Sequence, residues 1–365
     1  MTGWRQRGRR RQAGLLAAGF LVLAPVSGYG QTTPPNPEAP KPAKPQPAKP
    51  APAAKPAPAK PAPGKPSAKP ADGKGGTAAL TPAGIDSTDI AYGAYQRGYY
   101  LTAFEEATKR VKAGNDPVAM TLLGELYFTG YGVPENRKLA HDWYKKAADA
   151  GSVPALFALG LMTLSGDGGT RQDEQQAAKL FRQAAEKGHG PAAYNLGLLY
   201  LQGRKMPKEP AEAARWFEVA ASKDVEDAQY ALAVLLKEGN GVDRDIPAAA
   251  LLMAAAARLG HITAQVEFAI MQFNGVGVPK DERAAAVLFR RAALGGNAIA
   301  QNRYARLLAV GRGVPQDKVM AVAWHLLAKK RGLGDPMLDD VMAQLPEADR
   351  KKAEEQAIRW QLGRS

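Results

Sequence analysis

The 365-residue chain lacks cysteine altogether and has only 7% aromatic residues and four histidines. The absence of cysteine excludes a disulfide scaffold, a thiolate zinc site, a cysteine nucleophile and the lipid-modified cysteine of a lipoprotein. None of the histidines has a second histidine four residues away, the spacing that a helical metal site uses. We therefore interpret His141, His189, His261 and His325 as loop or helix-surface residues, and the sequence predicts no metal site, no cofactor and no enzymatic activity.

Residues 77–365, the larger part of the chain, also have little net charge. The net charge is +14, but residues 1–30 contain five arginines and no acid, and residues 31–76 contain eight lysines and two acids. Only +3 is left for residues 77–365. Nucleic-acid-binding domains concentrate positive charge on their folded surface. The sequence therefore predicts no nucleic-acid partner.

The first 30 residues are typical of a signal peptide. Arginines precede an uncharged, mostly apolar run from Ala13 to Val26. This run is shorter than the roughly 20 residues of a membrane-spanning helix, and Pro25 interrupts its end, so we favour cleavage near residues 28–31 over an uncleaved anchor. We expect export to the periplasm or cell envelope of a bacterium, with no stable membrane span after cleavage. In the alternative, the N-terminus anchors the chain and the rest lies outside the cytoplasm.

Residues 31–76 are predicted to form a disordered spacer rich in proline, alanine and lysine. Frequent proline excludes helices and sheet ladders and favours an extended polyproline conformation. At ~3.1 Å per residue, the segment from Thr32 to Pro70 could reach roughly 120 Å. Its lysines would keep it extended by mutual repulsion. The same charges also allow weak contact with anionic cell-wall material, and the two interpretations are compatible.

Residues 119–335 consist of six repeats. An alanine recurs every 36 or 37 residues, at Ala119, Ala155, Ala192, Ala228, Ala264 and Ala300. Five positions after each alanine stands a small residue: Gly124, Gly160, Gly197, Ala233, Ala269 and Ala305. Six positions further on stands a glycine: Gly130, Gly166, Gly203, Gly239, Gly275 and Gly311. Agreement at several positions in six units identifies a repeat array.

Each repeat is predicted to be a pair of helices. In the first unit, apolar residues such as Leu123 and Leu126 recur at helical spacing until Gly130, where a tight turn ends the helix. A second amphipathic helix follows, and we place its Trp143 in the core between the helices. One such pair cannot cover its own apolar faces, so neighbouring pairs stack and share a continuous core.

This pattern resembles the Sel-one-like repeat (SLR) branch of the tetratricopeptide superfamily. Residues 119–151 match nearly every position of A-x-x-x-L-G-x-x-Y-x-x-G-x-G-V followed by A-x-x-W-Y/F-x-x-A-A-x-x-G. The later units depart from it only locally, with Lys205 at the second turn glycine and Leu252 and Leu288 at the tryptophan. The resemblance implies an all-α, right-handed α-solenoid that serves as an adaptor or scaffold. Residues 77–118 would form an N-terminal capping hairpin, and residues 336–365 would form C-terminal capping helices.

Some cysteine-rich relatives in this family are associated with β-lactam binding or hydrolysis. The present chain has neither cysteine nor a Ser-x-x-Lys motif, so no residues support that activity here.

The candidate partner site is a row of apolar residues on the first helices of the middle repeats. The second, sixth and ninth residues after each anchoring alanine share one helix face. In the middle units the only non-apolar residue at these positions is Lys237, and we name the apolar ones the apolar row: Phe157, Leu161, Leu164, Tyr194, Leu198, Leu201, Tyr230, Val234, Val266, Ile270 and Phe273. Resemblance to tetratricopeptide arrays implies that this face lines a concave groove able to hold an apolar helix or an extended peptide. Alternatively, tight curvature buries these residues as ordinary core.

The sequence as a whole favours an exported envelope scaffold that binds a protein or peptide partner through this face. In the alternative, the protein is a cell-wall or polysaccharide-associated factor that uses its cationic proline-rich segment. A hydrolase is the least supported function.

Overall fold

The computed structural model describes residues 89–363. The expected signal peptide, the spacer and residues 77–88 of the expected cap lie outside the described residues. Sixteen α-helices make up the described part, and it contains no strand. The predicted all-α repeat architecture is confirmed.

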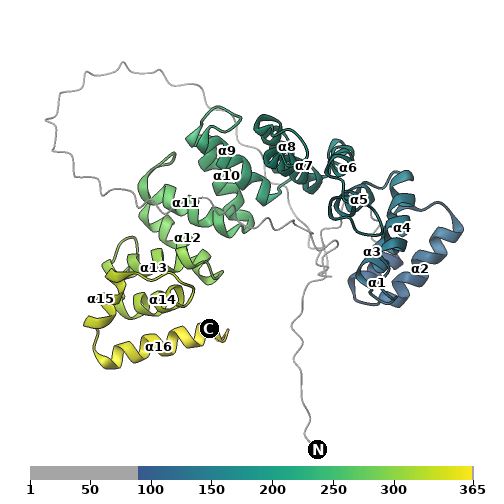
Figure 1. Cartoon of the computed structure of the whole chain (residues 1–365). Coiled ribbons are helices and arrows are strands. Elements are labelled where there is room, and N and C mark those ends of the chain that lie inside the picture. Colours follow the sequence, from purple (N-terminus) through teal and green to yellow (C-terminus); the bar gives the residue numbers. More distant parts are fainter. Residues whose placement is uncertain (1–88, 364–365) are drawn as a thin grey trace, which may run out of the picture. The chain divides into compact units, whose positions relative to one another are not determined.

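Along the repeats each helix packs against the one before and the one after it, whereas the last helix of the chain packs on the second helix of the sixth repeat, so the array is a stack of successive helix pairs (Figure 1). Six pairs correspond to the six repeats, and two further pairs flank them. The first helices of the repeats are α3 (Pro117–Thr129), α5 (Val153–Ser165), α7 (Gly190–Gln202), α9 (Glu226–Glu238), α11 (Ile262–Asn274) and α13 (Ala298–Val310). The second helices are α4 (Arg137–Asp149), α6 (Glu174–Glu186), α8 (Pro210–Ala221), α10 (Ile246–Leu259), α12 (Glu282–Leu294) and α14 (Lys318–Lys330).

Glycine ends every first helix, as the repeat pattern predicts. The glycines from Gly130 to Gly311 adopt positive φ values of 61–81°, a left-handed conformation that costs glycine little. Most second helices begin at an aspartate or asparagine whose side chain accepts a hydrogen bond from a backbone N–H of the first turn. The C-terminal end of each first helix and the N-terminal end of most second helices are therefore defined by residues at the turn between them.

A close contact between a glycine and an aromatic ring joins the two helices of the first three repeats. A Cβ atom on Gly124 would lie 2.6 Å from the ring of Tyr144, and a Cβ on Gly160 would lie 2.5 Å from the ring of Phe181. Gly197 has the same relation to Phe217. These rings are fully buried. The small residue five positions after the anchoring alanine is therefore needed because a ring occupies the space beside it.

The placement of two residues differs from the sequence-based expectation. Trp143, expected in the core, is only half-buried and lies beside Lys146, whereas the neighbouring Tyr144 is buried. His325, expected on a helix or loop surface, is completely buried. Tyr144 and His325 both stand eight positions after the N-cap of their second helix, where the side chain points into the core. A surface assignment for His325 failed because that position is internal whatever residue fills it.

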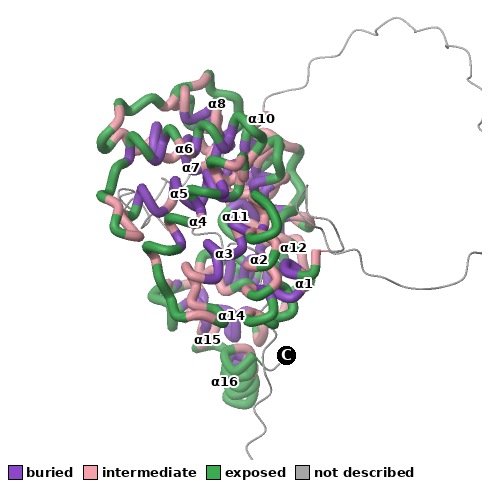
Figure 2. Tube along the Cα trace, turned by 90° about the vertical axis from the view of Figure 1, so that its right-hand side faces the viewer, coloured by how far each residue is buried: buried purple, intermediate pink, exposed green. Residues whose placement is uncertain are grey.

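The flanking helix pairs cover the ends of the array. At the N-terminal end lie α1 (Ile90–Gln96) and α2 (Tyr100–Ala113), with Gly98 in the turn at a φ of 81°. At the C-terminal end lie α15 (Pro336–Gln344) and α16 (Glu347–Gln361). The ring of Trp360 in α16 stacks on Trp324 at 4.1 Å between centroids. The remaining surface of α16 is mostly exposed (Figure 2), as a terminal helix requires.

Pro346 is the N-cap of α16, one residue earlier than the first-turn position expected from the sequence. None of the helices within residues 89–363 combines the length and the apolar character needed to cross a lipid bilayer.

Candidate protein-binding surface

The structure places the apolar row on α5, α7, α9 and α11 as a set of buried and half-buried side chains. Phe157, Leu164 and Val266 are buried. The other eight residues of the row are half-buried, and none is fully exposed. All eleven pack into or against the core clusters that join neighbouring helices. The row therefore supports the stack of repeats and also leaves part of its apolar surface in contact with solvent.

Row residues that stand two positions after an anchoring alanine also contact the N-cap of the first helix of the next repeat. The ring of Phe157 lies 4.7 Å from His189, and the ring of Tyr230 stacks on His261 at 4.4 Å between centroids. Both histidines are N-caps, because their Nδ1 atoms accept the backbone N–H of Ala192 and of the equivalent alanine in α11. Sequence reasoning placed these histidines in equivalent loops but missed their role as caps. Their spacing before the anchoring alanine was the available signal.

Burial changes the pKa of one residue of the apolar row, Tyr194, and of His189 beside the row. Burial lowers the pKa of His189 from 6.5 to about 4, because the charged imidazolium loses its hydration. Burial, with a smaller effect of Asp227, raises the pKa of Tyr194 to about 12. His189 is therefore neutral at physiological pH, and its unprotonated Nδ1 can serve as a cap acceptor.

The N-terminal end of this surface is polar, but its polar group is internally satisfied. Glu125 stands at the sixth position after Ala119 and is buried. It accepts hydrogen bonds from the hydroxyl of Tyr144 at 2.8 Å and from the hydroxyl of Tyr95 at 3.4 Å. Burial raises the pKa of Glu125, and these two hydrogen bonds oppose that change. Glu125 thus connects α3 to its partner helix and to the N-terminal pair.

The C-terminal end is polar for a similar reason. Arg306 donates from Nε and Nη2 to the two carboxylate oxygens of Asp335, at 2.5 and 3.0 Å. Asn302 donates to the same carboxylate at 2.7 Å. Asp335 is buried and also caps α15, so the sixth repeat and the C-terminal pair are linked through one carboxylate. Burial by itself would raise the pKa of Asp335, but the hydrogen bonds from Arg306 and Asn302, together with the charge of Arg306, lower it below its usual value.

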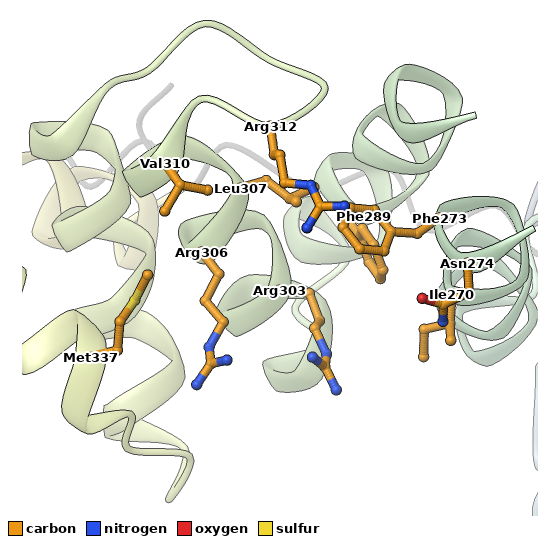
Figure 3. Close-up of a pocket in the computed structure, with 10 residues that line it drawn as sticks. All are labelled: Ile270, Phe273, Asn274, Phe289, Arg303, Arg306, Leu307, Val310, Arg312 and Met337. Carbon is orange, nitrogen blue, oxygen red and sulfur yellow. The ribbon is translucent and has the colours of Figure 1, made fainter. Parts of the chain in front are cut away.

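A pocket of about 310 Å³ lies at this C-terminal end, between α11 and α13, with α12 and α15 closing it (Figure 3). Its apolar lining consists of Ile270, Phe273, Phe289, Leu307, Val310 and Met337. Its polar lining consists of Asn274, Arg303, Arg306 and Arg312. Only Ile270 and Phe273 belong to the apolar row. Arg306 stands at the sixth position after Ala300, where the middle repeats have row residues. Arg303, Leu307 and Val310 stand on a neighbouring stripe of α13, and Met337 comes from outside the repeats, so the periodicity of the row does not indicate these four.

Comparison with known proteins identifies the repeat. A family described as Sel1 repeat matches six successive segments, 117–152, 153–189, 190–225, 226–261, 262–297 and 298–333. These segments begin two residues before the anchoring alanines and together cover more than half of the chain. The protein belongs to the Sel1 repeat family. No curated protein matches the chain.

Solved structures of Sel1 repeat proteins are similar to this chain. The crystal structure of a Sel1 repeat protein from Oxalobacter formigenes is 32% identical, with a TM-score of 0.59, over 66% of this chain and 98% of that one. The crystal structure of c5321, a protective antigen of uropathogenic Escherichia coli strains with an SLR fold, is 27% identical. That match covers 72% of this chain and 64% of the antigen, with a TM-score of 0.46.

The Sel1 repeat array of this protein is a scaffold suited to protein binding. Stacked helix pairs present many side chains at regular spacing along one continuous surface, which is how repeat proteins contact extended partners. No group of three or more histidine, cysteine, aspartate or glutamate side chains within residues 89–363 is arranged to hold a metal ion. The residues of the apolar row and of the pocket offer apolar contact, hydrogen bonding and ion pairing.

Proposed function

We propose that this Sel1 repeat protein is an exported scaffold of the bacterial cell envelope and binds a protein or peptide partner through its apolar row. The observation that carries the proposal is the half-burial of eight row residues on four consecutive first helices. An apolar stripe that stays partly exposed over four helices, interrupted by Lys237 on α9, is typical of a surface that a partner covers. Because the row follows the array from repeat to repeat, an elongated partner fits it better than a small molecule.

The N-terminal sequence supports the envelope location. A basic segment, an apolar run and small residues precede the lysine- and proline-rich residues 31–76. In this proposal the latter segment holds the Sel1 repeats away from the surface to which the protein is attached or attracted. The second candidate function, association with cell wall or polysaccharide, is supported by the +6 charge of residues 31–76 and would use that segment directly.

Site-specific photo-crosslinking tests the binding face. A photoreactive phenylalanine analogue would replace Leu198 on α7, in the middle of the apolar row. The matched control would carry the same analogue at Val219 on α8, which is exposed but lies outside the row. Both variants would be expressed in the native host and irradiated in intact cells.

We expect the Leu198 variant to give a discrete adduct with an envelope protein and the Val219 variant to lack it. Identical adducts from both positions would contradict the binding role of the row. Recovery of the folded protein only in the cytoplasmic fraction would contradict the envelope location.

A further inference from the structure

The pocket between α11 and α13 differs from the rest of the row because arginines surround its apolar wall. Ile270, Phe273, Leu307 and Met337 supply apolar surface, and Arg303, Arg306 and Arg312 are the only charged residues of the lining. The volume of 310 Å³ is at the lower end of the roughly 300–1,000 Å³ typical of ligand pockets. It suits one or two apolar side chains, not a whole folded domain.

Two of the three arginines already hold a carboxylate of this chain. Arg306 is paired with Asp335, and Arg312 donates from Nε and Nη2 to Glu282 at 3.1 and 2.6 Å. The guanidinium carbon of Arg312 also lies 4.6 Å from the centre of the Phe273 ring. These contacts hold both arginines at the pocket and leave each of them further N–H donors.

Arg303 is the cation that remains available. It is exposed, it stands near the middle of α13, and no residue within 89–363 forms an ion pair or a hydrogen bond with its guanidinium. Arg303 and Arg306 extend from α13 in the same direction, side by side (Figure 3). An arginine in this position binds a carboxylate with two parallel hydrogen bonds, a geometry that lysine cannot reproduce.

Two kinds of segment could occupy the pocket: the N-terminal residues of this chain or a segment of a partner protein. Their charges distinguish them. Residues 1–76, most of the segment outside the described part, carry a net charge of +11 and only two acids, so they offer few carboxylates that could pair with Arg303. A partner segment that combines apolar and acidic residues complements both the wall and the rim. We propose that this pocket binds an apolar side chain of an acidic partner segment and that an aspartate or glutamate beside that side chain pairs with Arg303.

This inference rests on the proposed function and specifies the chemistry of the partner. The apolar side chain contributes burial against Phe273 and Leu307. The carboxylate contributes orientation and selectivity, because a lysine placed next to Arg303 would meet a like charge instead of a partner. The pocket thereby fixes which end of the partner lies at the sixth repeat.

The test uses the full chain and three fluorescent hexapeptides capped at both ends, so that only side-chain carboxylates are offered. The first is Asp-Glu-Leu-Phe-Glu-Asp, the second has Ser-Gly in place of Leu-Phe, and the third has lysine in place of each acid. Fluorescence anisotropy gives the dissociation constant of each peptide at low and at physiological salt. The variants are Arg303→Glu and Val310→Asp at the pocket, with Lys179→Glu as a matched charge reversal at an exposed position of α6.

We expect the wild-type protein and Lys179→Glu to bind the first peptide best and more tightly at low salt. Arg303→Glu should weaken that binding at least about tenfold, equivalent to ~1.4 kcal/mol. Val310→Asp should also weaken it. Both changes lie at exposed positions, so circular dichroism should show an unchanged fold.

Equal binding of the acidic and basic peptides, equal binding by wild type and Arg303→Glu, or no binding of the first peptide would overturn the inference. A specific adduct at Leu198 combined with any of these results would leave the proposed function standing and remove only the pocket assignment. Selective binding of the first peptide without an adduct at Leu198 would support the pocket assignment and count against the proposed binding role of the apolar row.

Discussion

Removal of one buried ring tests whether the contact between an aromatic ring and a glycine stabilises a repeat. Phe181 on α6 is fully buried, and its ring fills the space beside the backbone of Gly160 and lies 5.8 Å from the ring of Phe157. Phe181→Ala removes this ring and leaves a cavity, a change that typically costs about 3–5 kcal/mol. One wall of the cavity is helix backbone at Gly160, which cannot move inward as a side chain can. We therefore expect a loss in the upper half of that range.

The assay is hydrogen exchange measured along the full chain, together with urea unfolding. Because each Sel1 repeat contacts mainly its neighbours, exchange should accelerate in α5, α6 and α7 and remain unchanged in α13–α16. The control is Leu251→Ala on α10, at a side chain that is 71% exposed, where the loss should stay within about 0.5 kcal/mol. A uniform increase in exchange over the whole chain, or a loss for Phe181→Ala as small as that of the control, would refute this account.

Four further predictions follow from the same contacts. Trp143→Ala should cost less than the ~3–5 kcal/mol of a fully buried aromatic, since the side chain is half-buried; an equal loss in urea unfolding would place Trp143 in the core after all. Because the pKa of His189 falls from 6.5 to about 4 on folding, the unfolded chain binds more protons in that interval and stability should decrease as the pH drops through it. His189→Asn keeps a capping oxygen and should flatten this pH dependence, measured by urea unfolding at each pH. Deletion of residues 31–76 should leave the helical circular dichroism unchanged and abolish salt-sensitive co-sedimentation with anionic envelope material; binding that persists at high salt would argue against an electrostatic role. Tyr194→Ala combined with Tyr230→Ala should lower the melting temperature modestly and partner capture strongly, and full capture by this double variant would contradict a binding role for the row.

The repeat architecture was predictable because its signals are local and occur six times. The anchoring alanines, the small residue five positions later and the turn glycines each reflect a steric need within one helix pair. Where one repeat departs from the pattern, the other five still show which residue type the position requires. The identity of the buried ring was less secure, because Trp143 and Tyr144 are adjacent and a rotation of the helix by one position exchanges core and surface.

The candidate site was only partly predictable. Periodicity located the apolar row but left open whether it is groove or core, and the structure places its residues between these extremes. The pairing of Glu125 with two tyrosines and of Arg306 with Asp335 was not visible in the sequence, because these partners come from different helices. The pocket was missed for the same reason. Its lining combines two repeats with Met337 of the C-terminal pair.

The sequence by itself determined the helix pairs, their boundaries and their number, since glycine conformation, N-capping and the spacing of apolar residues act within a few residues of one another. Only the tertiary structure decided which polar residues are internally paired, that His325 is buried, and that Arg303 lies beside an apolar pocket without an ion-pair partner among residues 89–363. These properties depend on distances between helices of different repeats. Such distances result from the rotation and offset of each pair on the next, which no single repeat encodes.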